Sequence, residues 1–393
     1  MKKVLIIGAS ILQLPAIKKA KELGYYVGVI DYNPNAIGVP YADKFFCVST
    51  IDIEGVVKTA REFSPDGIMT LATDMPMRSI AAACEALGLA GITCETALKS
   101  TDKGEMIKAF AENGVEHPWY YIINGKEELD SVINKITFPC ISKPTDNSGS
   151  RGVMLINSKE ELVESIEYSS SQGRSGSVIV EEYLTGNEVS VEIMTLDGEI
   201  SILQVTDKLT TGAPHFVEMG HSQPSALPKA SVEAIKDLAS RAVRAVGIKN
   251  GPAHVEIMMT KNGPRMIELG ARMGGDCITT HLVPLSTGID MVEATINLAC
   301  GEKVDIKPKF NRGSAIRYFR APTGVIKEIT GVEEAKKIPG VIEISFTKGI
   351  GDTVGEIGSS TDRVGFVIAQ ADTPASAAAI CDQALETVKM LIE

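Results

Sequence analysis

Short apolar runs alternate with amphipathic stretches through the first hundred residues. Residues 4–7 and 26–30 are apolar runs, and the positions between them have the spacing of a helix at 11–23. Apolar strands separated by helices are typical of a parallel sheet that is covered on its faces. We therefore predict a strand, helix, strand unit, continued by strands in "DGIMTLATD" and "GLAGIT" and by helices at 53–62 and 77–87.

From residue 99 the pattern becomes that of capped helices and antiparallel strands. Asp102 and Glu105 have the spacing of a capping box, which predicts a helix ending at Gly114. Asp197-Gly198 predicts one β-hairpin, and Lys261-Asn262-Gly263 predicts another. Further helices are expected at 158–171, 232–246 and 373–392. These changes divide the chain into expected domains of residues 1–98, 99–301 and 302–393.

The second hairpin is expected to place two carboxylates opposite each other. A three-residue turn centred on Asn262 pairs Met258 with Met266 and Glu256 with Glu268. Alternation gives one face Glu256, Glu268, Gly270 and Arg272, and the other face Ile257, Ile267 and Leu269. Facing carboxylates repel, so one interpretation is a cation between them, for which Mg²⁺ is suited. The alternative is a pair of solvated glutamates on an exposed sheet face.

The segment "ISKPTDNSGSRGV", residues 141–153, has the composition of a phosphate-binding loop. Glycines let the backbone approach an anion, although the residue order is not that of a P-loop. Lys143 precedes the loop, and Lys103 begins a helix, where its charge opposes the helix dipole and suggests another partner. Simple surface exposure of both lysines is the alternative.

The stretch "VIVEEYLTGNEVSVE" ends one strand and begins the next. Alternation puts Glu181 and Tyr183 on one face and Glu182 on the other, and Glu188 opens the following strand. Such carboxylates could accept hydrogen bonds from an adenine amino group and from ribose hydroxyls, but a polar strand exit explains them equally well. NAD is disfavoured, because "GASILQ" keeps only one of the three glycines of a dinucleotide-binding turn.

Charge and cysteine usage restrict the class of protein. The net charge of −11 argues against nucleic-acid or anionic-membrane partners. No run approaches the roughly 20 apolar residues that span a bilayer, and lysines 18 and 19 interrupt the N-terminal apolar stretch before any signal-peptide cleavage site. Seven scattered cysteines without C-x-x-C spacing indicate reduced thiols in the cytoplasm.

The order of these features resembles the ATP-grasp superfamily of ligases. It runs from the helix lysine through strand-Lys-Pro, the Gly/Ser loop and "EEYLTGNEVSVE" to the paired glutamates and "ELGARMGG". Residues 1–98 are similar to the family's pre-ATP-grasp domain, and "DRVGFVIAQADTPASAA" resembles its closing segment. The resemblance implies an α/β fold of ATP-grasp architecture: an N-terminal Rossmann-like parallel sheet, two α+β ATP-grasp subdomains and a small C-terminal α+β segment.

The resemblance also implies roles for residues in binding ATP. The loop would close over the phosphates, the strand exit would hold adenine and ribose, and Glu256 and Glu268 would hold Mg²⁺ or Mn²⁺. Lys143 and Arg272 are the expected catalytic residues. The implied ATP-binding set is Lys103, Lys143, Ser148, Gly149, Ser150, Gly152, Glu181, Glu182, Tyr183, Leu184, Glu188, Glu256 and Glu268.

The implied reaction is attack of a carboxylate on the γ-phosphate, followed by attack of an amine on the acyl phosphate. Many members read E-x-N-x-R, whereas Gly270 stands at the asparagine position in this chain. "ELGARMGG" and "FVEMGHSQPS" resemble the branch that contains L-amino-acid ligases. Residues expected to meet the substrates are Asp74, His215, Glu218, His221, Arg272, Gly274 and Gly275.

The main expectation is therefore an ATP-dependent carboxylate–amine ligase acting on an amino acid or small metabolite. Its partners would be small-molecule carboxylates and amines, and a homodimer is expected on resemblance alone. One alternative is a purine-pathway ligase such as a phosphoribosylglycinamide synthetase. Another is a nucleotide-binding regulator that has lost turnover.

Overall fold

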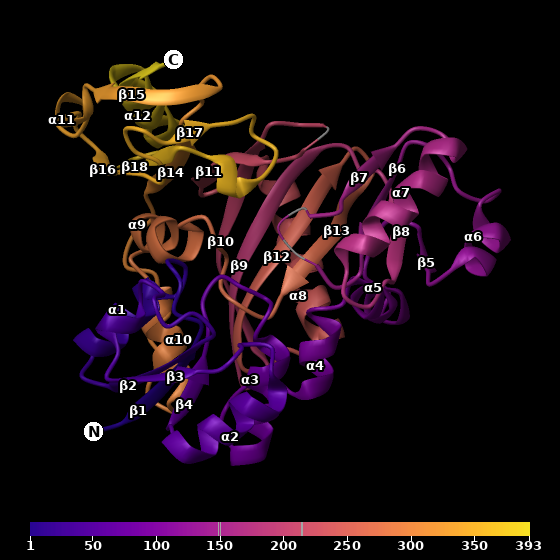
Figure 1. The fold of residues 1–393 in the computed structure, drawn as a ribbon, viewed down its shortest axis with the longest axis horizontal. Coiled ribbons are helices and arrows are strands. Elements are labelled where there is room, and N and C mark those ends of the chain that lie inside the picture. Colours follow the sequence, from indigo (N-terminus) through magenta and orange to yellow (C-terminus); the bar gives the residue numbers. More distant parts are fainter. Residues whose placement is uncertain (148, 150, 214) are drawn as a thin grey trace.

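An open parallel sheet begins the chain in the computed structural model, which describes residues 1–147, 149, 151–213 and 215–393 (Figure 1). The strand order is β3-β2-β1-β4, and each neighbouring pair is parallel, as the apolar runs predicted. The elements are β1 (Lys3–Ile7), α1 (Leu14–Glu22), β2 (Tyr26–Asp31), β3 (Lys44–Cys47), α2 (Ile53–Phe63), β4 (Gly67–Met69), α3 (Met77–Leu87) and α4 (Cys94–Lys99).

Two details of this sheet follow from local hydrogen bonding and backbone conformation. Asp31 accepts hydrogen bonds from the backbone N–H groups of Ala9 at 2.8 Å and Asn33 at 2.9 Å, so this acid stabilises the turn after β1. The strand predicted in "GLAGIT" is wrong. Gly88 ends α3 with a φ of 68° and Thr93 already caps α4, so residues 89–92 form a short connection between two helices and join none of the described sheets.

A second, antiparallel sheet has the strand order β5-β8-β6-β7. The capped helix α5 (Lys103–Glu112) is confirmed, because Asp102 accepts from the N–H groups of Gly104 and Glu105 at 2.9 and 3.0 Å. The remaining elements are β5 (Tyr120–Ile123), α6 (Lys126–Val132), β6 (Cys140–Pro144), β7 (Met154–Ile156), α7 (Lys159–Gln172) and β8 (Val178–Glu182).

The largest sheet has eight strands in the order β13-β12-β9-β10-β11-β14-β18-β16. Its last three strands come from residues beyond 301, so the C-terminal lobe continues this sheet through the pairing of β11 with β14 (Figure 1). The strands are β9 (Asn187–Leu196), β10 (Glu199–Thr210), β11 (Glu218–Gln223), β12 (Gly251–Thr260), β13 (Gly263–Gly270), β14 (Gly313–Tyr318), β16 (Val341–Phe346) and β18 (Gly365–Ala371).

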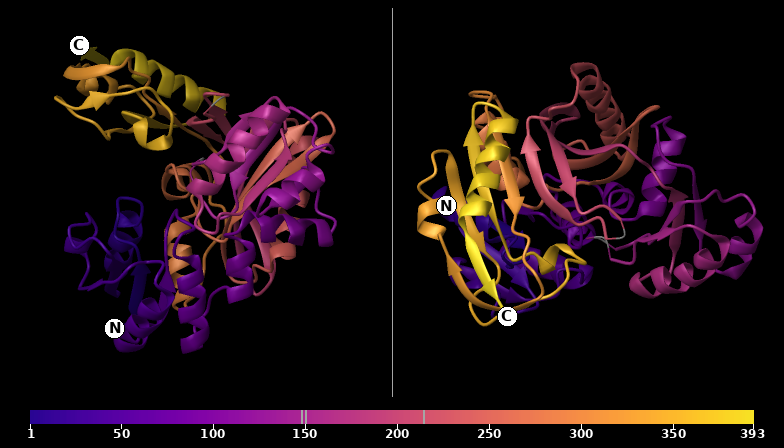
Figure 2. Two further views of the ribbon diagram at one scale, coloured as in Figure 1. Left: turned by 45° about the vertical axis from the view of Figure 1, so that its right-hand side comes forward. Right: turned by 90° about the horizontal axis from the view of Figure 1, so that it is seen from above.

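Helices and a small sheet complete the molecule (Figure 2). The final helix, α12, ends at Thr387, and residues 389–392 form a strand instead of continuing it, because they pair with β15. No helix among the described residues is long and apolar enough to cross a membrane. The elements are α8 (Lys229–Val246), a π-helix (Ile278–Leu282), α9 (Val283–Thr287), α10 (Met291–Ala299), β15 (Gly324–Thr330), α11 (Val332–Ala335), β17 (Thr353–Val354), α12 (Pro374–Thr387) and β19 (Lys389–Ile392).

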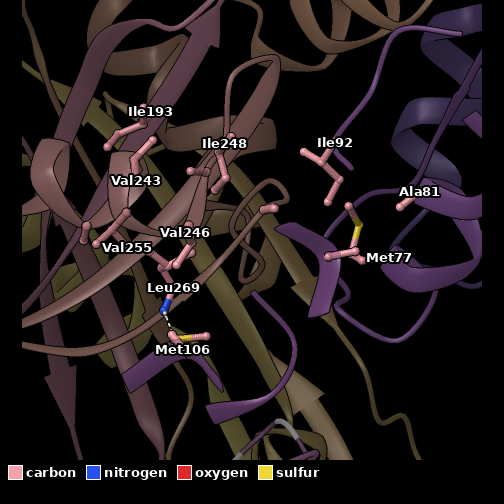
Figure 3. Close-up of a cluster of buried hydrophobic side chains, with 14 of the residues drawn as sticks. Met77, Ala81, Ile92, Met106, Ile193, Val243, Val246, Ile248, Val255 and Leu269 are labelled. Atoms are coloured by element: carbon pink, nitrogen blue, oxygen red, sulfur yellow. Dashed lines mark hydrogen bonds between the residues drawn. The ribbon is translucent and has the colours of Figure 1, made fainter. Parts of the chain in front are cut away.

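One apolar core joins the N-terminal helices to the large sheet (Figure 3). Met77 and Ala81 of α3 belong to the same buried cluster as Val243 of α8 and Val255 of β12. The backbone N–H of Leu269 also donates to the sulfur of Met106 at 3.3 Å (Figure 3). The start of α5 is thereby fixed against the strand that carries Glu268.

The β12–β13 hairpin has a shorter turn than predicted. Thr260 pairs with Gly263, so the turn consists of two residues instead of three. The predicted pairing of Met258 with Met266 is wrong, because Met266 lies opposite Ile257.

A β-bulge restores the predicted pairing of the carboxylates. Ile267 is the extra residue of β13, and beyond it Glu256 lies opposite Glu268. The bulge also changes the surroundings of Ile267, which lines the same cavity as Glu268 instead of facing away from it.

Candidate active site

A cavity of about 480 Å³ lies between the second sheet and strands β10, β12 and β13. The structure therefore brings most of the expected ATP-binding residues together: Lys103, Lys143, Gly149, Glu181, Glu182, Tyr183, Leu184, Glu188, Glu256 and Glu268 all line it. Gly152 is buried beside the cavity wall, where its carbonyl accepts from the Ser169 hydroxyl at 2.8 Å. Ser148 and Ser150 lie outside the described residues.

The lining of the cavity combines apolar side chains with hydrogen-bonding groups. Ile141, Met258 and Ile267 line it from three different strands, and Tyr183 and Leu184 line it where the chain leaves β8. Apolar side chains from facing strands can hold a flat aromatic ring, while backbone groups at a strand exit can recognise its polar edge. This combination suits a nucleobase.

Both expected phosphate-binding lysines pair with carboxylates of the same cavity. Lys143 Nζ lies 2.5 Å from Glu181 Oε1, and Lys103 Nζ lies 3.0 Å from Glu268 Oε2 and donates to the Asn147 carbonyl at 2.8 Å. Burial opposes the charge on Lys103, but Glu268 raises its pKa above the ordinary value. Lys103 is therefore held as a cation on the cavity wall, and Lys143 is paired with a carboxylate of the same wall.

The facing glutamates have the chemistry of a Mg²⁺ site. Burial favours their neutral forms, yet Lys208 lowers the pKa of Glu256 well below its usual range, and Lys103 lowers that of Glu268. No group of three or more His, Cys, Asp or Glu suited to a metal occurs among the described residues. Two ionised carboxylates in an open cavity leave room for the water and phosphate oxygens that Mg²⁺ prefers. The residues present thus fit this ion.

Lys208 on β10 belongs to the same cluster, although the sequence analysis missed it. Its side chain is 2% exposed, and its Nζ lies 2.7 Å from Glu188, 3.1 Å from Glu256 and 3.6 Å from Glu218. Counting from the Asp197-Gly198 turn would place Lys208 opposite Asn187. The extra residue in β10 at position 203 shifts the register by one and brings Lys208 beside Glu188.

The buried side chain of His254 contacts Glu256. His254 Nδ1 lies 3.0 Å from Glu192 Oε2, and its Nε2 lies 3.1 Å from Glu256 Oε1. Burial alone would lower the pKa of His254, but Glu192 and Glu256 raise it to about 9. The imidazolium can donate to both carboxylates and fix Glu256. Alternation along "AHVEIMM" puts His254 and Glu256 on one face, which is a signal that the sequence analysis did not use.

A second cavity, of about 360 Å³, adjoins the first. Lys103, Asn147 and Glu268 line both cavities, and Arg78, Arg174 and Arg272 are among the other residues of the second. The two cavities therefore meet where the expected phosphate-binding lysine and metal-binding carboxylate lie.

Arg272, which lines this second cavity, binds the carboxylate of Asp74 through two nitrogen atoms. Its Nε and Nη2 donate to the two oxygens of Asp74, both at 3.0 Å. A Cβ atom at position 270 would lie 2.5 Å from Asp74 Oδ1. Glycine in place of the usual asparagine therefore makes room for Asp74 to reach Arg272.

The other residues expected to meet substrates are only partly brought together. Glu218 lines the first cavity, and His221 is buried, with its Nε2 3.3 Å from Asp276 Oδ2. Gly274 packs so closely on His254 that a Cβ atom there would lie 2.6 Å from Nδ1. His215 is exposed and lines neither cavity.

Comparisons with known proteins agree with this architecture. Residues 136–280 match the ATP-grasp domain family, and residues 317–393 match the L-amino acid ligase C-terminal domain 2. An alanine–anticapsin ligase of Bacillus subtilis (strain 168) is 27% identical over 323 residues, covering 76% of this chain and 67% of the relative.

Two solved structures share the fold over the full length of the chain. An L-amino acid ligase from Bacillus licheniformis superposes with a TM-score of 0.86 at 22% identity, covering 100% of this chain and 99% of the other. A phosphoribosylglycinamide synthetase from Anaerococcus prevotii gives 0.81 at 24% identity, with full coverage of both chains. The match identifies residues 136–280 as an ATP-grasp domain, and the chain shares the overall fold of both structures. Residues 317–393, in the C-terminal lobe, match the second C-terminal domain of the L-amino acid ligases.

Proposed function

We propose that this protein is an ATP-dependent ligase that joins an amino acid or another small carboxylate to an amine. One observation carries the proposal: two cavities that both contain charged side chains meet at Lys103 and Glu268. The first is proposed to hold the nucleotide. The second has Arg272 at its edge, whose guanidinium already contacts the Asp74 carboxylate through two nitrogen atoms. A phosphate donor and a carboxylate acceptor could therefore meet at the shared wall.

The first step would form the acyl phosphate. A substrate carboxylate beside Arg272 would attack the γ-phosphorus of ATP, and the bond from that phosphorus to the β,γ-bridging oxygen would break to release ADP. Lys103 and Lys143 would neutralise charge on the phosphoryl oxygens. Glu256 and Glu268 would hold Mg²⁺, or alternatively Mn²⁺, which supplies further positive charge at the phosphates when bound.

In the second step, the amine would attack the acyl carbon, and inorganic phosphate would leave. The amine must lose a proton, and Glu218 and His221 are the proposed residues for recognising the amine substrate and accepting that proton. Selectivity would come from residues 210–221, 274–281 and 73–75, which flank the nucleotide-binding strands. The B. subtilis relative, named for the ligation of alanine to anticapsin, supports an amino-acid substrate.

The test is ADP release measured with Mg²⁺ over pairs of amino acids, and separately with glycine and phosphoribosylamine. We expect release only when a carboxylate and an amine are both present, together with an amide product detected by mass spectrometry. Release with phosphoribosylamine alone among the amines would favour the purine-pathway alternative. No stimulated release from any pair would favour a nucleotide-binding regulator.

Two further expectations concern the cellular location and the oligomeric state of the protein. All seven cysteines are unpaired, which supports a reducing, cytoplasmic location. A homodimer is proposed from the resemblance, and a monomeric mass by light scattering would contradict it.

A further inference from the structure

An arginine of the C-terminal lobe reaches the segment that follows β13. Arg363 lies just before β18, is 8% exposed, and donates from Nη1 and Nη2 to the two oxygens of Asp276, both at 2.7 Å. Its Nη1 also donates to the backbone carbonyl of Glu218 at 3.1 Å. One guanidinium thus joins three parts of the molecule: the C-terminal lobe, the segment after β13, and β11.

The guanidinium is itself held in place by its own lobe. Its Nε donates to the Ser360 carbonyl at 2.9 Å, and its central carbon lies 3.8 Å from the centre of the Tyr318 ring. Ser359 and Asp362 form a capping box around the short helical turn that precedes it. A planar donor that is fixed on its face and edges offers a defined two-point contact to a carboxylate.

Asp276 needs such support because of its backbone. Asp276 and Cys277 are consecutive non-glycine residues with φ values of 51° and 60°, in the left-handed region that costs free energy for L-residues. Asp276 directly follows Gly274 and Gly275, and its carboxylate also lies 3.3 Å from His221 Nε2. The Arg363 contact therefore stabilises a strained turn and orients a carboxylate toward His221.

His221 depends on this carboxylate for its orientation. The ring is 1% exposed, and its Nδ1 has no hydrogen-bond partner among the described residues. Among the described residues, the polar contact of the ring is the one from Nε2 to Asp276, and it determines which ring nitrogen is left without a hydrogen bond. Loss of Asp276 in its observed position would leave the buried ring without a polar partner on either side.

We infer that Arg363 is a positioning residue through which the C-terminal lobe orients His221, by way of Asp276, and Glu218, by way of its carbonyl. The inference rests on the proposed function, in which Glu218 meets the amine and the buried His221 supports it. Arg363 touches neither the expected phosphate-binding lysines nor the facing glutamates. Its effect should fall on the amine-dependent step and not on ATP binding.

The kinetic test compares Arg363→Ala with Arg312→Met. Arg312 belongs to the same lobe but forms an exposed ion pair with Asp372 at 3.4 Å, away from both cavities. We expect Arg363→Ala to lower amine-dependent kcat about 100-fold while KM for ATP stays within twofold, and ethylguanidinium to restore part of the rate. Arg312→Met should remain within twofold in all constants. Equal losses in both variants, or a parallel rise in KM for ATP, would overturn the inference.

A second measurement does not require activity. ¹⁵N-histidine NMR reports the tautomer of His221, whose signals are assigned by their loss in His221→Gln. We expect Arg363→Ala and Asp276→Asn each to shift these signals, and the double variant to shift them no further than the larger single change. Unchanged signals in folded Asp276→Asn or Arg363→Ala would refute the positioning role. If the wild type releases no ADP with any substrate pair, the proposed function fails, while the NMR result still decides the Arg363 contact.

Discussion

Two buried charge clusters in this molecule are built in opposite ways. Around Lys208, one ammonium faces three carboxylates, those of Glu188, Glu218 and Glu256. Around Arg363, one guanidinium faces the single carboxylate of Asp276, and its other donors bind backbone carbonyls. The first cluster has an excess of negative charge, and the second is balanced.

The imbalance has a physical consequence for Glu218. Burial raises its pKa above the ordinary value, and repulsion from Glu256 adds to this rise despite the nearby Lys208. The Asp276 carboxyl, by contrast, is buried yet has its pKa strongly lowered by Arg363 and His221. An unbalanced cluster that opens into a cavity indicates where cationic ligands bind, whereas a balanced, enclosed pair indicates where the fold is fixed.

The largest expected effect is on the unbalanced cluster, through Glu268→Gln. The change removes a negative charge from the proposed metal site and removes the ion pair of Lys103, which keeps its hydrogen bond to the Asn147 carbonyl. We expect ATP turnover to fall about 10,000-fold, roughly 5 kcal/mol in the barrier. The midpoint of thermal unfolding should change little, because Glu268 borders the cavity. ADP release is measured against Mg²⁺ concentration.

The control for this variant is Glu105→Gln on α5, which alters an exposed ion pair with Lys108. It should keep wild-type turnover. Wild-type activity of Glu268→Gln at low Mg²⁺ would show that the metal assignment is wrong.

The next effect concerns stability and follows from Lys208→Met. Three carboxylates then face one another without their shared cation, and we expect the free energy of unfolding to fall by about 4 kcal/mol in the absence of Mg²⁺. Added Mg²⁺ should recover part of this loss, because a cation can again occupy the cluster. Chemical denaturation with and without Mg²⁺ measures both quantities.

Lys236→Met removes an exposed partner of Glu233 on α8 and provides the matched control, with an expected change below about 0.5 kcal/mol. Equal stability of the two variants, without any dependence on Mg²⁺, would contradict a charge-imbalanced site.

The same two clusters show what could be predicted from the sequence. The facing carboxylates were predicted because hairpin pairing and alternation are local properties. Lys208 was missed because a single extra residue at position 203 shifts the β10 register, and a bulge leaves no clear mark in the sequence. In the β12–β13 hairpin, the predicted turn was one residue too long and the bulge at Ile267 was not predicted. These two errors cancelled, so the predicted pairing of Glu256 with Glu268 was still correct.

Long-range contacts were beyond the reach of sequence patterns. Asp74 and Arg272 are 198 residues apart, and Arg363 and Asp276 come from different predicted domains. The parallel N-terminal sheet was predicted from its apolar runs, whereas the strand at residues 389–392 was mistaken for helix, because its partner β15 lies far away in sequence. The fold class, and the set of residues that lines the first cavity, could therefore largely be predicted, but the contacts between lobes could not.

The third prediction is a pH dependence of the unbalanced cluster. The pKa of His254 is raised from 6.5 to about 9, against burial, by Glu192 and Glu256. The contribution of protonated His254 to the free energy of unfolding is therefore complete below pH 6.5 and is lost as pH rises through about 9. A shift of this size corresponds to about 3 kcal/mol of unfolding free energy in Mg²⁺-free protein. Denaturation at pH 6, 7.5 and 9.5 measures it.

His254→Gln should lose this pH dependence, while His281→Gln, which alters a partly exposed contact with Glu343, should keep it. Parallel curves for the wild type and His254→Gln would mean that the imidazole is not held as a cation between the two carboxylates.

The smallest expected effect separates the amine substrate from ATP within the unbalanced cluster. Glu218 has the longest contact with Lys208, 3.6 Å, and burial raises its pKa, so it is the carboxylate least committed to that cation. We expect Glu218→Gln to raise KM for the amine about tenfold, roughly 1.4 kcal/mol, while KM for ATP stays within twofold. Glu199→Gln, at an exposed site on the same strand ladder, should change neither constant. If KM for ATP rises instead, Glu218 contributes to binding the nucleotide and not the amine. The excess negative charge of the cluster would then be neutralised by the metal ion that accompanies ATP, without any contribution from the amine.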